Sequence, residues 1–243
     1  MSAAGASRGL LAYLVLTAVV CGGLIMVLEV LGSRVIGPFF GVSLYVWTSL
    51  ISVTLLALAC GYAVGGLLAD RFRSPAYLYA IVVAAGILTL CIPLLKVPVM
   101  RACATLGLRG GSFVGTLLLF GPALFALGCV TPYVTRLAVR ELDRVGHAIG
   151  AFYALSTLGS VIGTLVTGFL LIGRLGITDI FRLAALLLIA LGCGYFIIFR
   201  RHWATAALLM IPFIPLSEAP GTATMPDGSE RDLAWLNFGL IDW

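Results

Sequence analysis

Long runs of apolar residues alternate with short polar or charged segments along most of this chain. The runs are about 20 residues long, the length an α-helix needs to cross a bilayer, whereas spanning strands alternate over about ten residues. The lipid core offers the backbone no hydrogen-bond partners, so that only helices or a closed barrel can cross it. The pattern therefore predicts membrane-spanning helices.

The runs divide the chain into a short N-terminal tail (1–8), a helical membrane domain (9–216) and a polar C-terminal tail (217–243). We predict an all-α polytopic protein of about seven transmembrane helices. The last apolar run is only marginally long enough to cross. The expected spans are 9–30, 43–69, 76–95, 112–134, 148–172, a sixth ending near 199, and 203–216.

Glycine and proline follow the first span in a segment that remains apolar. Gly32, Gly37, Pro38 and Gly41 predict that the helix breaks here. Non-helical apolar chain at membrane depth must be buried in protein or line a cavity. The break is therefore expected to lie beside a buried site.

The composition limits the class of protein. Hydrophobic residues make up 61% and charged residues 10% of the chain, whereas a soluble domain carries about 25% charged residues. The formal net charge is +5. We attribute it to basic cytoplasmic loops and contact with anionic lipid, and we expect the bilayer, not nucleic acid, as the partner. We expect a multi-pass protein of a bacterial inner membrane, and the distribution of basic residues favours a cytoplasmic N-terminus.

Motifs of soluble enzymes are absent from the sequence. It contains no phosphate-binding loop, no HExxH or GxSxG, and no glycine-rich dinucleotide fingerprint. The six cysteines form no CxxC pair, and we interpret them as small apolar residues. We expect no catalytic residue, cofactor or metal in this chain, and an enzyme acting on a lipid-soluble substrate is disfavoured.

Glu29 is the acidic residue nearest to the interior of the first six spans. A carboxylate within the membrane is costly, so it normally pairs, becomes protonated or faces water. Arg34 is its natural partner if the helix unwinds at Gly32. The pair is either structural, joining the first turn to the second span, or part of a site that binds a cation or couples protons. Placement of Glu29 at the interface is a third possibility.

Aromatic side chains provide a second part of a candidate site. Tyr45, Trp47, Tyr62 and Tyr153 could surround an organic cation through cation–π contacts. Interfacial belts and ordinary packing also place aromatics in membrane helices. Thr157 completes the candidate substrate-binding set, although hydroxyls in such helices also bond to backbone or across helices.

Glycines four residues apart occur in two predicted spans, as Gly61 and Gly65 and as Gly159 and Gly163. This spacing places both glycines on one face of a helix, where they permit close approach of a neighbour. The pattern is common and does not identify the neighbour.

Asp70, Arg71 and Arg73 follow the second span. At a cytoplasmic junction between helices, the carboxylate could accept from helix N-terminal amides while the arginines reach a neighbouring helix or lipid phosphate. Such a cluster could act as a latch between two conformations. The alternative is an ordinary charged loop.

Three segments together resemble the N-terminal membrane region of fused major-facilitator/spermidine-synthase proteins. They are EVLGSR at 29–34, GPFFGVSLYVW at 37–47 and GYAVGGLLADR at 61–71. GAFYALSTLGSVIGT at 150–164 is similar to a second landmark of the same family. The resemblance covers about 10–200 and implies half of a major-facilitator fold with one additional short helix.

The segment GLLADRFR at 66–73 is also similar to the cytoplasmic loop motif between the second and third helices of major-facilitator transporters. It departs from that motif at Phe72 and Arg73, where a Gly-Arg pair often follows. Members of the fused family carry a C-terminal aminopropyltransferase domain that uses decarboxylated S-adenosylmethionine. We expect any such reaction to depend on another chain.

Two functions follow as hypotheses. In the first, the protein handles or exports a small organic cation related to polyamines. Glu29 would face the cation, aromatics around Tyr45 and Tyr62 would form the wall, and a second copy or a partner protein would complete the pathway. In the second, it is a scaffold or subunit that docks a partner enzyme, such as an aminopropyltransferase, or a larger membrane complex.

Overall fold

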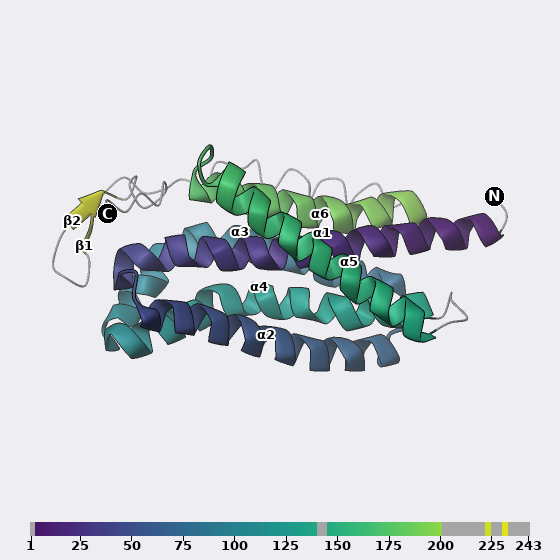
Figure 1. Cartoon of the computed structure of the whole chain (residues 1–243), viewed down its shortest axis with the longest axis horizontal. Coiled ribbons are helices and arrows are strands. Elements are labelled where there is room, and N and C mark those ends of the chain that lie inside the picture. Colours follow the sequence, from purple (N-terminus) through teal and green to yellow (C-terminus); the bar gives the residue numbers. More distant parts are fainter. Residues whose placement is uncertain (1–2, 140–144, 201–221, 225–229, 233–243) are drawn as a thin grey trace.

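A bundle of long helices forms most of the computed structural model, which describes residues 3–139, 145–200, 222–224 and 230–232 (Figure 1). Most of the helices follow the long axis of the bundle, while α5 crosses α1 obliquely. The helices are α1 (Ala3–Phe40), α2 (Leu44–Arg71), α3 (Pro75–Ala104), α4 (Gly107–Val139), α5 (Val145–Val166) with the π-helical turn η1 (Thr167–Leu171), and α6 (Ile177–Arg200).

Six helices of the described residues are long and apolar enough to cross a membrane. The predicted all-α polytopic class is therefore confirmed, and the protein is an integral membrane protein. The expected seventh run, 203–216, lies outside the described residues. Two short strands within the predicted polar tail were not anticipated: β1 (Thr222–Thr224) pairs antiparallel with β2 (Glu230–Asp232).

The predicted break in the first helix is wrong at Gly32 and Gly37, because α1 continues to Phe40. Gly32 instead makes room for α2: a Cβ atom there would lie 2.5 Å from a methyl carbon of Leu50. The chain breaks at Gly41, whose φ of +76° is rarely adopted by other residues. Glycine at position 32 therefore serves packing, not unwinding.

The most extensive helix pair, α2 with α4, is not consecutive in sequence. α2 and α4 run side by side in the same direction, with Ser49 and Ser112 bonded near their starts and Asp70 and Arg136 paired near their ends. α5 likewise runs parallel to α1, while α3 packs antiparallel against α4 and α6. We call the two ends of the bundle the Asp70 end, which also holds the N-terminus, and the Tyr45 end (Figure 1).

Glycines allow the backbones of these parallel pairs to touch. A Cβ atom on Gly65 would lie 2.5 Å from the carbonyl oxygen of Cys129 in α4, and Gly61 is equally close to the backbone there. Between α5 and α1, a Cβ atom on Gly163 would lie 2.5 Å from the carbonyl oxygen of Gly23. The predicted close approach is confirmed at both glycine pairs, and the structure supplies the partner helices.

Candidate functional site

Glu29 lies on α1, about 17 Å along the helix axis from the end at Phe40. It is partly buried, and its carboxylate forms no hydrogen bond or ion pair with any residue that the structure describes. In a continuous helix, residues five apart are separated by about 140° around the axis. The expected pairing with Arg34 through an unwound turn is therefore not formed.

The face of α1 that carries Glu29 also meets α5. Gly22, two turns earlier on this face, accepts a hydrogen bond from the Ser160 hydroxyl at 2.9 Å. Ser33, one turn later, lines a cavity of about 250 Å³ at the Tyr45 end. Glu29 is consequently one helical turn from this cavity.

The cavity joins two of the predicted site residues. Arg34 of α1 and Trp47 of α2 both line it, together with Ser33. Gly168 of η1 and Ile172 close the opposite wall. A basic side chain, a hydroxyl and an indole ring thus surround one space, which gives this end of the bundle a polar recess within the membrane helices.

Tyr45 lies near the cavity but is occupied by a cation of the protein itself. The Arg109 guanidinium is 4.8 Å from the centroid of the Tyr45 ring, and one of its nitrogens donates to the phenol oxygen at 2.9 Å. A cation–π site that already holds an arginine offers less to an external cation. Arg109 was not predicted as a partner, since it is 64 residues away in sequence.

Tyr62, Tyr153 and Thr157 form a separate group nearer the Asp70 end. Tyr62 and Tyr153 are close enough to interact electrostatically, and the Thr157 hydroxyl donates to the Tyr153 carbonyl oxygen at 2.9 Å. Tyr62 is about 26 Å along α2 from Tyr45. The predicted single aromatic wall around Tyr45 and Tyr62 is therefore wrong, because seventeen residues of straight helix separate the two rings.

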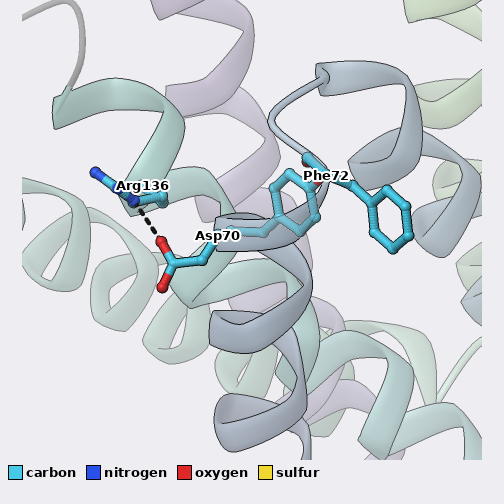
Figure 2. Close-up of polar contacts among 4 residues, drawn as sticks. Asp70, Phe72 and Arg136 are labelled. Carbon is cyan, nitrogen blue, oxygen red and sulfur yellow. Dashed lines mark hydrogen bonds and ion pairs between the residues drawn. The ribbon is translucent and has the colours of Figure 1, made fainter.

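The Asp70 cluster joins α2 to α4. Figure 2 shows the Asp70 carboxylate turned toward Arg136, whose Nε is 2.8 Å from a carboxylate oxygen. The side chains of Asp70 and Arg136 are 66% and 46% exposed. Arg71 and Arg73 are exposed, and the Arg71 guanidinium lies 5.7 Å from the centre of the Phe72 ring. Asp70 is thus bound to a basic residue of a neighbouring helix, although the sequence did not identify Arg136.

Tyr133 fixes the turn that follows Asp70. Its side chain is fully buried, and its hydroxyl donates to the carbonyl oxygen of Phe72 and lies 3.2 Å from that of Ser74. Ser74 in turn caps α3, with its hydroxyl oxygen accepting from the Ala76 amide at 3.4 Å. One buried phenol therefore connects α4 to the whole α2–α3 turn.

We expect Tyr133→Phe to destabilise the protein more than Asp70→Asn. The first removes the hydroxyl that donates to partly buried backbone carbonyl oxygens and should cost about 1–2 kcal/mol. The second breaks an exposed ion pair and should cost less than about 1 kcal/mol. Thermal unfolding of both variants in detergent at low and high salt tests this order. A larger, salt-dependent loss for Asp70→Asn would show that the ion pair dominates.

Lys96 is a further charged residue of a membrane helix. It lies within α3 and is only 5% exposed. Among the described residues, no group of three or more His, Cys, Asp or Glu side chains could hold a metal, and the cysteines are free. The geometry thus offers two polar regions within or at the ends of membrane helices: the recess beside Glu29 and the Asp70 cluster.

The chain was compared with known proteins at three levels. Family models, curated proteins and solved structures yield no match.

Proposed function

We propose that this integral membrane protein handles a small organic cation, related to polyamines, and moves it across the membrane. The observation that carries the proposal is the Glu29 carboxylate, which is partly buried in a membrane helix and has no partner among the described residues. A charge at this depth is costly unless compensated. A bound cation would compensate it, and a negative charge would favour cations over neutral solutes.

The recess beside Glu29 supports a bound molecule of modest size. It measures about 250 Å³ and carries the Trp47 ring, which is 46% exposed and can contact a cation or an alkyl chain. Arg34 lines the same space and would repel a cation placed deep within it. We therefore place the cationic group on the Glu29 side and the alkyl part toward Trp47.

A second copy of the chain would complete the pathway. The least buried spans are α5 and α2, in which 11% and 33% of the most apolar stretch is buried. In each of the other four spans, half or more of that stretch is buried. Glu29 lies on the face of α1 that meets α5. Two copies facing each other across α2 and α5 would enclose Glu29, Tyr62 and Tyr153 between two lobes, the arrangement that transporters with repeated halves use.

The resemblance to fused major-facilitator/spermidine-synthase proteins supports the polyamine assignment and a cytoplasmic location of the Asp70 end. There the Asp70–Arg136 pair would act as a latch between the ends of α2 and α4. Because both side chains are exposed to about half or more, the pair can open at little cost in free energy.

Spermidine uptake into proteoliposomes tests this proposal. We expect Glu29→Gln to reduce uptake about tenfold or more without lowering the unfolding temperature. A tenfold change corresponds to the free energy of one lost charge-assisted contact. Asp179→Asn is the matched control, because Asp179 is exposed and pairs with Arg182 at 3.0 Å on α6. Uptake by this control should stay within about twofold of wild type.

Three outcomes would contradict the proposal: no uptake by the wild-type protein, equal uptake by Glu29→Gln, or a clear loss of stability in Glu29→Gln. The last would indicate a structural carboxylate.

The second function, a scaffold for a partner enzyme, predicts a stoichiometric partner in mild-detergent purification. Mass spectrometry of the purified protein distinguishes this from a homo-oligomer.

A further inference from the structure

An apolar groove separate from the Glu29 recess lies between α1, α5 and α6. It measures about 300 Å³, and its lining is almost entirely carbon. Its three walls include Val27 of α1, Ile162 of α5 and Leu187 of α6. Ile162 is 58% and Leu187 46% exposed, so that the groove opens sideways to the surrounding bilayer. A molecule could therefore enter it from the membrane.

Thr167 provides the groove with one hydroxyl that has no partner. Its side chain is completely buried, lines the groove and forms no hydrogen bond with any described residue. Six helical threonines elsewhere in the described part of the chain donate to the carbonyl four residues earlier: Thr17, Thr89, Thr116, Thr135, Thr157 and Thr164. Leaving a buried hydroxyl unpaired costs free energy that a bound acceptor would recover.

The backbone conformation also changes at Thr167. The helix changes at this residue to the π-helical turn η1, closed by a hydrogen bond from the Ile172 amide to the Thr167 carbonyl oxygen at 3.1 Å. Single π-helical turns occur inside α-helices and often coincide with functional sites. Here the turn accompanies a hydroxyl that is not used within its own helix.

The depth of Thr167 indicates what kind of acceptor could reach it. It lies four residues, or about 6 Å, before the end of the span at Leu171. Arg174 follows in the turn to α6 and is exposed. From the membrane interior toward its surface, a bound molecule would therefore meet the apolar walls of the groove, then the Thr167 hydroxyl, and then the positive charge of Arg174.

We propose that the groove binds an anionic phospholipid. One acyl chain fills the space between α1, α5 and α6. Its ester carbonyl accepts from the Thr167 hydroxyl, and its phosphate lies beside Arg174. A volume of about 300 Å³ corresponds to about ten water volumes, and thus to a chain segment of about ten carbons. A helix from a second copy would fill the walls but would supply no ester acceptor for Thr167.

Native mass spectrometry tests whether the groove binds this lipid. The full-length protein is purified in mild detergent that contains equal amounts of phosphatidylglycerol and phosphatidylcholine. We expect one retained phosphatidylglycerol per chain. Ile162→Trp should remove it by filling the groove. Val161→Trp is the matched control, because Val161 is 51% exposed on the same helix and does not line the groove; its lipid should remain.

A second pair of variants tests the hydroxyl without changing the volume of the groove. Thr167→Val should lower lipid retention about fivefold, the effect of one hydrogen bond. Thr164→Val is the control, since its hydroxyl bonds within its own helix, and retention should be unchanged. If both variants unfold at the wild-type temperature in lipid-free detergent, any difference in retention reflects lipid binding and not folding.

Several results would overturn the proposal. The wild-type protein could retain no phospholipid, or it could retain a membrane-soluble molecule without an ester in place of phospholipid. It could also show no preference for phosphatidylglycerol, or Ile162→Trp and Val161→Trp could retain equal amounts of lipid. A disulfide formed efficiently between two copies of an Ile162→Cys protein would also overturn it, because the groove would then be covered by a second copy.

Discussion

Gly65→Leu is expected to lower the free energy of unfolding by about 3 kcal/mol, at the upper end of the cost of overpacking. Gly65 touches the backbone of α4, where even a Cβ atom would lie 2.5 Å from two atoms of Cys129. Both contacts are to backbone, which cannot rotate away as a side chain could. α2 and α4 would have to separate along the longest shared interface in the bundle.

The measurement is unfolding of the purified protein in detergent, followed by circular dichroism. Gly66→Leu is the control, because position 66 is the neighbour in the same helix and has nothing within 4 Å of a Cβ atom. Its stability should match wild type within about 0.5 kcal/mol. Equal destabilisation by both substitutions would show that helix flexibility, and not contact with α4, explains glycine at position 65.

Gly159→Leu should have a more local effect and lower the free energy of unfolding by about 2–3 kcal/mol. A Cβ atom on Gly159 would overlap the backbone of Val19 in α1. Since only 11% of the most apolar part of α5 is buried, α5 depends on this contact with α1. We expect α5 to detach from the bundle while the α2–α4 interface remains formed.

Hydrogen–deuterium exchange in detergent can resolve this difference. In Gly159→Leu, amides of α5 should exchange faster, whereas those of α2 and α4 should keep their protection. Gly150→Leu is the matched control on α5, where a Cβ atom meets nothing within 4 Å. Faster exchange throughout the bundle would contradict a local role for the α1–α5 contact.

The class of fold followed from the sequence because the physical constraint is strong. A chain with 10% charged residues and long apolar runs has few alternatives to membrane helices. The paired glycines also indicated close helix contacts. They could not identify the partners, because Gly61 and Gly65 fit any helix that presents small residues, and α4 is distant in sequence.

The site was less predictable, for reasons that particular residues illustrate. Gly32 indicated a helix break, yet the same residue serves equally well to admit the Leu50 side chain. The partner of Asp70 is Arg136, 66 residues away, and pairing across that distance leaves no local signal. The unpaired hydroxyl of Thr167 lies at the start of a π-helical turn, and the pattern of apolar residues reveals neither feature.

The parallel pairing of α1 with α5 has a consequence for biogenesis. The first helix enters the membrane long before the fifth has been synthesised, because ribosomes add about 5–20 residues each second. Until Gly159 and Gly163 arrive, the glycine face of α1 around Gly22 and Gly23 has only lipid, or another protein, against it. A chaperone or insertase that recognises small-residue faces would find its substrate in this interval, and α5 would then displace it.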